Sequence, residues 1–452
     1  MNKDNDNKVL IKIPPRLDDI LDEETKLQIG QKFLSTNKLA DKIIVDKSIK
    51  SNTIMVSGRL LAHIKSTASS QIFHQLNYNL LPEKIIKVGP IVGVLIAGKE
   101  NAGSLPVARR ARIYKELSQH AAKKNIFIYF FQAHDVDWNH QRVKGLIYDP
   151  QAKKNGAWIK AGFFLPDIVY NRISFRHKED TEAVQEFMKK ARHTNIYLFN
   201  SRFLNKWEVH QSLVNHPKTR EFSLETDCYS NEALSKYLNK YNEFFIKPVA
   251  NSIGKGIIKV ISTRPDRIEY FRLGRTSNWQ ICHSQAELYT RLSIPQGEKY
   301  ILQKGIILAS IDNRIFDIRA QVQKDGQGIW QFTGAAVRLA ATGKFVTHVP
   351  NGGSKRDYYL TVKEVFGSSS SVMQGLDKQL KTICRTVPQI LEDSLGINLA
   401  VLSMDIGIDR DGRMWIIEVN SKPASFDEEA IYKRHLGFLT DYLLFKANFV
   451  VH

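Results

Sequence analysis

The chain has 452 residues and a formal net charge of +19, because 65 lysines and arginines outnumber 46 aspartates and glutamates. Its hydrophobic share of 43% and charged share of 25% are those of a globular protein and exclude wholesale disorder. The length suggests about three domains, at roughly 150 residues each. Cys228, Cys282 and Cys384 are too few and too scattered for a disulfide framework, and none forms a C-x-x-C metal motif.

Membrane and export signals are weak in this sequence. The most apolar run, residues 88–98, is well short of the roughly 20 residues that span a bilayer. The N-terminus lacks the long apolar stretch of a secretory signal. We therefore expect a cytoplasmic protein without a transmembrane segment.

The positive charge is spread along the chain and does not form a basic tail. It indicates an anionic partner, which could be an acidic polymer, an anionic surface or a nucleotide. No helix-turn-helix, zinc-finger or RNP-like pattern accompanies the charge, which disfavours a nucleic acid as the anionic partner.

Short apolar runs between polar stretches characterise the first 88 residues, at 9–13, 42–45 and 53–56. Such runs predict strands of a small β-rich region. The region carries no chemical motif, which favours a docking or packing role.

The pattern of apolar residues changes at Gly89. Apolar strands alternate with helical segments, in the order 89–98, 108–124, 126–131, 166–173 and 179–191. This alternation predicts a parallel α/β layer over residues 89–199.

From about residue 200 onward, apolar strands dominate and one long amphipathic helix interrupts them. We expect strands at 300–306, within 316–338, and as a final pair at 400–409 and 413–420. The helix over 372–395 has an apolar face made of Leu376, Leu380, Ile383, Val387, Ile390 and Leu391. It should stop at Gly396, and Pro388 should kink it.

The segment FFIKPVANSIGKGIIKV, residues 244–260, is the most informative. Lys247 ends an apolar strand, and the following loop contains Ser252, Gly254, Lys255 and Gly256. Glycines let backbone N–H groups approach phosphate oxygens, and the lysines supply charge. The alternative is a plain β-hairpin with a basic tip.

A second group of polar residues lies in MDIGIDRDGRMWIIEVN. Asp405 is on one strand of the final pair, and Glu418 and Asn420 share one side of the next. Oxygen ligands of these types suit Mg²⁺. The alternative is the solvated face of an edge hairpin.

Arginines follow the same strands. Arg319 shares a side with Asp317 in FDIRAQVQ, Arg338 lies in TGAAVRLA, and Asn351, Gly352 and Gly353 form a later loop. Guanidinium groups suit bidentate contacts to phosphate or carboxylate. The alternative is that Arg319 pairs with a structural acid.

The order of these motifs resembles the ATP-grasp superfamily, and within it the YheC/YheD family of endospore coat-associated proteins. The resemblance covers nearly the whole chain. It rests on the segments GPIVGVL, PDIVYNRI, NSRFLNKWEVH, FIKP…GKGI, YILQKGI, FDIRAQVQK, HVPNGG and IIEVNSKP.

The resemblance implies a fold of the α/β and α+β classes, with an ATP-grasp domain after a parallel α/β (pre-ATP-grasp) domain. It places the small β-rich region at 1–88, the pre-ATP-grasp domain at 89–199 and the ATP-grasp domain at 200–452. Within the last, a flap subdomain is expected at about 200–305 and a metal-binding subdomain at about 306–452.

The resemblance also implies roles for single residues. Lys206 and Lys247 would be the nucleotide lysines. Ser252, Gly254, Lys255 and Gly256 would form the flap over the phosphates, and Gln303, Lys304, Gly305 and Ile306 the linker that meets adenine. Asp405, Glu418 and Asn420 would bind the metal, and Arg319 and Arg338 would stabilise the transferred phosphoryl group. Asn251 and Gln303 depart from the residues that many relatives have there.

The implied activity is an ATP- and Mg²⁺-dependent ligase that joins a carboxylate to an amine-type nucleophile through an acyl-phosphate. Two Mg²⁺ ions, with Mn²⁺ as a substitute, fit this chemistry. Substrate contacts are expected from Arg172, Arg176, Asn351, Gly352 and Gly353, although a solvated basic surface explains the two arginines equally well. The substrate would be a small-molecule or peptide carboxylate, and spore-coat components or an anionic polymer are further expected partners. The alternative is a spore-associated structural or binding protein with a catalytically weak shell.

Overall fold

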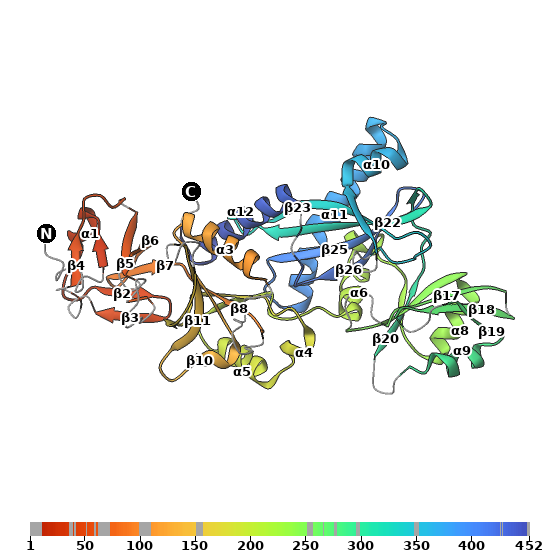
Figure 1. Ribbon diagram of the computed structural model, residues 1–452, viewed down its shortest axis with the longest axis horizontal. Helices are drawn as coiled ribbons and strands as arrows, with labels where there is room; N and C mark the ends of the chain where they lie inside the picture. The colour runs from red at the N-terminus through yellow and green to blue at the C-terminus, as the bar shows by residue number, and fades with distance from the viewer. Residues whose placement is uncertain are drawn as a thin grey trace.

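The computed structural model describes most of the chain, namely residues 11–35, 39, 42–50, 52–57, 60–61, 73–98, 110–150, 157–250, 256–264, 266–274, 278–294, 299–347, 352–424, 426 and 428–449. These residues form four β-sheets. Figure 1 shows the first sheet at one end of an elongated molecule, the third sheet at the other end, and the second and fourth between them. No helix among the described residues is both long and apolar enough to cross a membrane.

The first sheet has seven strands in the order β3-β2-β7-β6-β5-β1-β4, and α1 (Pro15–Asp18) is a short helix beside it. Its strands are β1 (Ile11–Ile13), β2 (Lys26–Ile29), β3 (Lys32–Ser35), β4 (Ile43–Val45), β5 (Thr53–Ser57), β6 (Phe73–Leu81) and β7 (Ile85–Gly89). The strands predicted at 9–13, 42–45 and 53–56 correspond to β1, β4 and β5, and residues 9 and 10 lie outside the described residues.

The second sheet has the order β10-β11-β9-β8-β13-β14, with β12 paired to β11. Its strands are β8 (Ile91–Leu95), β9 (Phe127–Phe131), β10 (Val136–Asp137), β11 (Arg142–Asp149), β12 (Ala157–Phe164), β13 (Ile168–Asn171) and β14 (Tyr197–Phe199). Strands β8, β9, β13 and β14 run parallel, so the predicted parallel layer is confirmed. Every residue of β8 and β9 is buried, as expected for a sheet covered on both faces.

Helices cover this second sheet. They are α3 (Ala111–Lys123), the 3₁₀ turn η4 (Ala133–Asp135), α4 (Arg176–Glu179) and α5 (Glu182–Ala191). The helix predicted over 179–191 is therefore two pieces, because Asp180 and Thr181 separate α4 from α5.

The third sheet has the order β15-β20-β16-β17-β18-β19 and is antiparallel throughout. Its strands are β15 (Thr226–Cys228), β16 (Glu243–Pro248), β17 (Ile258–Arg264), β18 (Arg267–Arg272), β19 (Gln280–Cys282) and β20 (Tyr300–Lys304). Two helices, α8 (Asn231–Lys240) and α9 (Gln285–Leu292), bury Leu234, Tyr237 and Leu288 against one face. Two more, α6 (Lys206–Val214) and α7 (Pro217–Arg220), precede the sheet in the chain.

The fourth sheet has the order β24-β23-β22-β25-β26, and β21 pairs with β22. Its strands are β21 (Ser310–Ile311), β22 (Arg314–Lys324), β23 (Trp330–Leu339), β24 (Ser354–Asp357), β25 (Val401–Ile408) and β26 (Met414–Asn420). Its helices are α10 (Tyr358–Phe366), α11 (Ser370–Leu395) and α12 (Glu429–Lys446).

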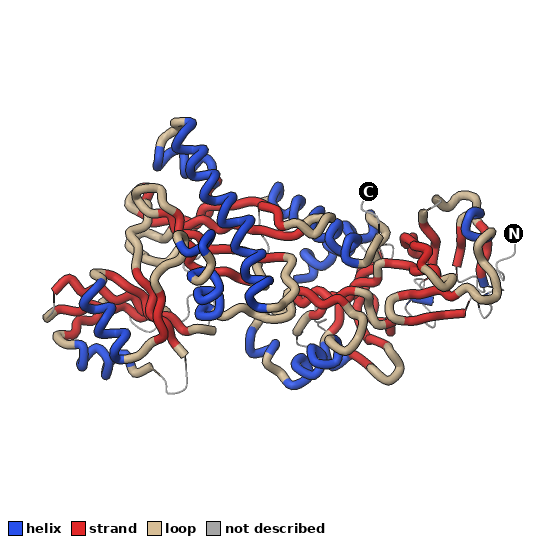
Figure 2. The backbone as a smooth tube through the Cα atoms, turned by 180° about the vertical axis from the view of Figure 1, so that it is seen from behind, coloured by secondary structure: helices blue, strands red, loops and turns tan. Residues whose placement is uncertain are grey.

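One face of the fourth sheet packs on α11, the long helix crossing the strands in Figure 2. All six predicted apolar residues of this helix are buried, and Gly396 ends it with a φ of 60°. Helix α11 runs from Ser370 to Leu395 as a single element with Pro388 inside it, at the position where a kink was predicted. Even-numbered residues of β22, such as Phe316 and Ile318, face α11.

Odd-numbered residues of β22 face the opposite side. Gln321 and Gln323 contact the ring of His435 on α12, which shows that α12 covers part of this face. Helix α12 also reaches the second sheet, where the hydroxyls of Tyr442 and Tyr197 lie 2.6 Å apart. Lys124 and Asp441 form an ion pair at the same contact. The second and fourth sheets are therefore joined by the last helix, and Asp317 and Arg319 lie on the side that α12 leaves partly open.

Candidate nucleotide and metal site

A cavity of about 430 Å³ lies between the third and fourth sheets. Its lining combines apolar side chains with charged ones. The charged lining residues are Glu243, Lys247, Lys259, Lys304, Asp317, Arg338, Asp405, Arg410 and Glu418. The structure therefore brings together Lys247, Arg338, Asp405 and Glu418, which the sequence analysis had selected from three separate motifs.

Lys247 ends strand β16 and is buried, with 7% of its surface exposed. Its Nζ donates a hydrogen bond of 2.5 Å to Oε1 of Gln303 on the neighbouring strand β20. Burial, together with the charge of Lys206, lowers the pKa of the Lys247 ammonium to about 8. Among the described residues this buried ammonium contacts a neutral amide and the ring of Phe245 but forms no ion pair, so it is well placed to receive an anionic group.

Lys206 is the first residue of α6, whose N-terminus is fixed by a capping box between Asn205 and Glu208. Its Nζ lies 3.2 Å from Oε1 of Glu418 on β26. The two predicted nucleotide lysines thus approach the cavity from different elements, one from a helix N-terminus and one from a strand.

The predicted metal ligands lie on β25 and β26. Asp405 is the cross-strand partner of Glu418, and Ser403 is that of Asn420. A bulge makes this possible, because Ile406 pairs with Ile416 and leaves one extra residue before Glu418. Without it, Glu418 would continue the alternation of Met414 and Ile416 and point into the core.

These side chains fit a magnesium ion. Asp405 and Glu418 line the cavity, and the Asn420 amide makes no hydrogen bond to any described residue. Carboxylate and amide oxygens are the ligands that Mg²⁺ prefers. No group of three His, Cys, Asp or Glu side chains suited to a metal occurs among the described residues, so the third protein ligand here would be an amide.

Both predicted arginines contact Asp405. Nη1 of Arg319 lies 2.9 Å from Oδ1, and Nη2 of Arg338 lies 3.0 Å from Oδ2. Arg338 is also fixed by two hydrogen bonds to Asp317, of 2.8 and 2.7 Å. The sequence analysis offered the alternative that Arg319 pairs with an acid. Arg319 does pair with an acid, and that acid is Asp405, the predicted metal ligand.

Burial acts against the charges of Asp317 and Arg338. It raises the pKa of the Asp317 carboxyl, although Arg338 opposes the rise. For Arg338, burial alone would lower the guanidinium pKa, but the charges of Asp405 and Asp317 raise it. The Thr347 hydroxyl donates a further 2.5 Å hydrogen bond to Oδ2 of Asp317. The guanidinium of Arg338 is therefore charged and held in one orientation at the cavity wall.

The predicted linker over Gln303, Lys304, Gly305 and Ile306 is only partly available to a ligand. The Lys304 N–H donates to the carbonyl of Glu225, and the Gly305 N–H donates to that of Glu243. The Ile306 N–H makes no backbone hydrogen bond to the described residues. Ile306 and Lys304 both line the cavity, whereas Gly305 packs on Glu243.

Other predicted residues lie at or beyond the limits of the description. Ser252, Gly254, Lys255 and Asn351 fall outside the described residues. Gly256, with a φ of 80°, begins the segment that leads into β17. Gly353 approaches the carbonyl of Thr347 so closely that an added Cβ would lie 2.6 Å away. Neither Gly352 nor Gly353 belongs to the described cavity lining.

Sequence reasoning missed the aromatic wall of the cavity. Phe345 lies in the loop after β23, and its ring is 5.5 Å from Phe271 and 6.3 Å from Phe245. Lys259 lies over the rings of Phe245 and Phe345 and forms an ion pair of 2.8 Å with Glu243. Phe345 stands in the polar stretch ATGKFVTH, and an isolated aromatic residue there is the only signal that could have indicated it.

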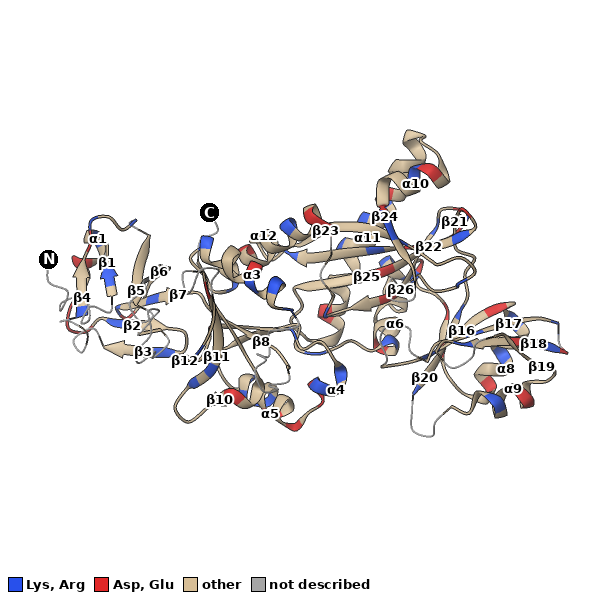
Figure 3. Cartoon of the chain, viewed as in Figure 1, with Lys and Arg blue, Asp and Glu red and all other residues tan. Residues whose placement is uncertain are grey.

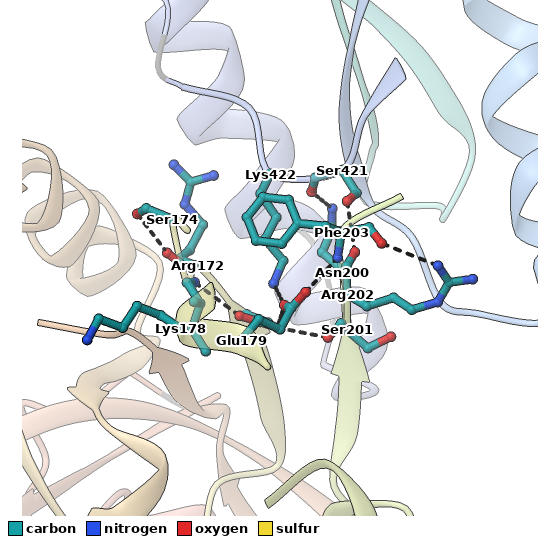
Figure 4. Close-up of polar contacts among 12 residues, drawn as sticks. Arg172, Ser174, Lys178, Glu179, Asn200, Ser201, Arg202, Phe203, Ser421 and Lys422 are labelled. Carbon is teal, nitrogen blue, oxygen red and sulfur yellow. Dashed lines mark hydrogen bonds and ion pairs between the residues drawn. The ribbon is translucent and has the colours of Figure 1, made fainter. Parts of the chain in front are cut away.

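Arg172 and Arg176 lie away from this cavity lining. They belong to a separate polar cluster around Glu179 and Lys422, at the junction of the second and fourth sheets (Figure 4). Lys422 follows Asn420 by two residues, so this cluster begins where the metal-binding strand ends.

Comparisons with known proteins identify the family of the chain. A family model described as YheC/D-like ATP-grasp matches residues 195–446. The chain is 27% identical over 384 residues to the endospore coat-associated protein YheD of Bacillus subtilis (strain 168), covering 80% of each protein. It is 25% identical over 325 residues to YheC of the same organism, covering 71% of this chain and 87% of YheC.

Among solved structures, the chain is similar to the D-cycloserine synthetase DcsG, with 14% identity and a TM-score of 0.45. That alignment covers 78% of this chain and 99% of DcsG. The family model, by contrast, spans more than half of this chain and includes every predicted nucleotide and metal residue. The chain belongs to the YheC/D-like ATP-grasp family.

Proposed function

We propose that the protein is an ATP- and Mg²⁺-dependent ligase that joins a carboxylate to an amine-type nucleophile through an acyl-phosphate. The observation that supports this most is the cavity itself. Lys247 lies on one side of it, and Asp405, Glu418 and Arg338 lie on the other. A triphosphate placed between them would meet cations at both ends, with oxygen ligands for a metal beside its last phosphate.

A carboxylate is a poor electrophile, and phosphoryl transfer to it creates a leaving group. Such a transfer depends mainly on positioning and charge stabilisation and needs no nucleophilic side chain. Asp405, Glu418 and Asn420 would hold Mg²⁺, which would supply neutralisation of the phosphate oxygens. Lys206 and Lys247 would bind the nucleotide phosphates, and Arg319 and Arg338 would stabilise charge on the transferred group.

Apolar side chains from both sheets would hold the base. Leu224, Ile306, Leu308 and Ile417 line the cavity. We assign the Ile306 N–H to adenine recognition, because the Lys304 and Gly305 N–H groups are already used within the third sheet. The phosphate flap at Ser252, Gly254, Lys255 and Gly256 stays part of the proposal.

The spore-coat connection comes from the relatives. YheD and YheC are both named endospore coat-associated proteins. We propose that this chain acts in the cytoplasm of a sporulating cell on a small-molecule or peptide carboxylate, and associates with coat components. The net charge of +19 suits an anionic partner of this kind, and Figure 3 shows its lysines and arginines distributed over all four sheets.

A second candidate function is a structural or binding protein of the spore with a catalytically weak ATP-grasp shell. The names of both relatives favour it, since they describe a location and no reaction. Both candidate functions are consistent with the same fold, but only the ligase is expected to turn over ATP.

Metal dependence is the first test of the ligase proposal. Calorimetric titration with the analogue AMPPNP and Mg²⁺ should show affinity that falls at least about tenfold in EDTA and in the Glu418→Gln variant. Glu418→Gln retains the shape of the side chain but loses the charge that a cation requires. Glu364→Gln is the matched control, because Glu364 is a half-exposed carboxylate on α10 that pairs with Arg356. Equal affinity under all of these conditions would show that the metal assignment is wrong.

Nucleotide binding should also depend on pH through Lys247. With a pKa of about 8, its free ammonium is charged at pH 6.5 and largely neutral at pH 9. Phosphate oxygens favour the charged form, so binding at pH 9 should take up a proton and be weaker than at pH 7. Calorimetry in buffers of different ionisation enthalpy measures this uptake. It should be absent at pH 6.5 and in Lys247→Met, and an unchanged uptake in that variant would assign the proton to another group.

A further inference from the structure

Glu179 forms an ion pair with Lys422 at the junction between the second and fourth sheets, and Arg172 and Arg202 lie in the same region (Figure 4). Arg176 belongs to this region as well, because its guanidinium group lies over the ring of Phe203, whose backbone N–H donates to Glu179. Arg172 follows β13, Arg176 begins α4, Arg202 lies before α6, and Lys422 follows β26. We define these four residues together with Glu179 as the junction cluster. It lies next to the proposed metal site, because Glu418 on β26 is close enough to influence the ionisation of Arg176.

Two of the cations are neutralised within the protein. Lys422, whose side chain is 1% exposed, pairs with Glu179, and Arg202 pairs with Glu208 at 2.7 Å. Glu179 also accepts hydrogen bonds from Nδ2 of Asn171 at 3.0 Å and from the Phe203 N–H at 2.7 Å. Its described partners do not include either of the two remaining arginines.

Arg172 and Arg176 form no ion pair with any described residue. Arg172 is 8% exposed, and Nη1 donates 2.9 Å to the carbonyl of Pro423. Arg176 donates through Nη2 to the carbonyl of Leu204, and its buried Nε has no partner. Their guanidinium groups stack on Tyr170 and Phe203, at 5.5 and 4.9 Å.

A buried guanidinium group, on Arg172, and a half-buried one, on Arg176, are costly without a counter-charge, since burial disfavours a charge that is not paired. An anion bound between the two arginines would relieve this cost and would engage the Nε–H of Arg176, which has no partner among the described residues.

We infer that the acid substrate carries a second anionic group besides the carboxylate that is activated, and that Arg172 and Arg176 bind this second group. The inference rests on the proposed ligase function and names its substrate class. The acid is a dicarboxylate or a carboxylate that bears a phosphate. Its reactive carboxylate would lie toward Glu418 and Arg319, and its second charge would lie in the junction cluster.

The test compares dianions with neutral-tailed copies of the same size. The full chain is titrated by calorimetry with malonate, succinate, glutarate and adipate, each beside its monoamide, and with 3-phosphonopropionate. At least one dianion should bind 10- to 100-fold more tightly than its monoamide, as expected for hydrogen bonds to a charged group. A preference for 3-phosphonopropionate over every dicarboxylate would identify the second group as phosphate, and the reverse order as carboxylate.

Arg172→Gln and Arg176→Gln should each remove most of the preference while the monoamide affinity stays the same. Arg192→Gln removes the same charge from an exposed position of the same region and should leave the preference unchanged. Binding of AMPPNP with Mg²⁺ reports whether each variant is folded. If Arg172→Gln does not fold, the test uses Arg176→Gln, because Arg176 is only half-buried.

Each titration is run with and without AMPPNP and Mg²⁺. Because the junction cluster lies outside the described cavity lining, the dianion preference is expected in both cases. Failure of nucleotide binding with the preference intact would contradict the ligase proposal alone. Equal binding of dianions and monoamides, no binding by any dianion, or full preference in both arginine variants would overturn the inference.

Discussion

Replacing Arg338 with alanine should lower the free energy of unfolding by about 3–5 kcal/mol, the usual cost of removing one partner from a buried ion pair. Arg338 is 6% exposed, contacts Asp317 through two hydrogen bonds and reaches Asp405 as well. Its loss would leave the buried carboxylate of Asp317 with Thr347 as its one side-chain donor among the described residues. Urea unfolding followed by tryptophan fluorescence measures the change.

Arg356→Ala is the matched control, because Arg356 pairs with Glu364 at the surface. Exposed pairs of this kind contribute about 0–1 kcal/mol. Asp317→Asn introduced beside Arg338→Ala should recover part of the lost stability, since it removes the uncompensated charge. A loss for Arg338→Ala no larger than that for Arg356→Ala would mean that Asp317 has another source of stabilisation.

Arg319→Gln should lower turnover by about 10²- to 10³-fold, which is the usual effect of removing one donor to a developing charge. Arg319 contacts Asp405 from outside the described cavity lining, so the affinity for AMPPNP should stay within a few-fold. The measurement is ADP release with a dianionic acid and an amine, set beside analogue binding for the same variant.

Arg385→Gln, on the exposed surface of α11, controls for the loss of one positive charge. Unchanged turnover in Arg319→Gln would assign the phosphoryl contact to another residue. If no pair of acid and amine released ADP with the unmodified protein, the structural or binding role would become the better proposal.

The sequence predicted the elements of the site better than their geometry. Apolar alternation was sufficient to locate β25 and β26, together with the ligands that they carry. It could not locate the bulge before Glu418, because a single extra residue changes the face of every following side chain without changing the composition. The shared side of Glu418 and Asn420 was predictable, whereas the placement of Glu418 opposite Asp405 was not.

Long-range contacts were beyond the sequence patterns for a similar reason. Asp317 and Arg338 lie opposite each other on neighbouring strands. The sequence showed the motifs that contain Arg319 and Arg338, but it could not show that both arginines contact Asp405. Glu179 and Lys422 meet across 243 positions of the chain, and no local periodicity links them. Helix α11 accommodates Pro388 in its interior, where Val387 and Leu391 on either side are buried in the core.

The position of α12 has a consequence for the synthesis of the chain. Its residues Leu439, Tyr442 and Leu443 cover Val92, Val94 and Phe199 of the second sheet, although about 230 residues separate β14 from α12. At roughly 5–20 residues per second, a ribosome needs about 10–50 s to make that stretch. During this time the apolar face of β8 and β14 lacks its covering helix. We therefore expect this face to be where a nascent chain depends on chaperones, and where slowed translation would cause aggregation first.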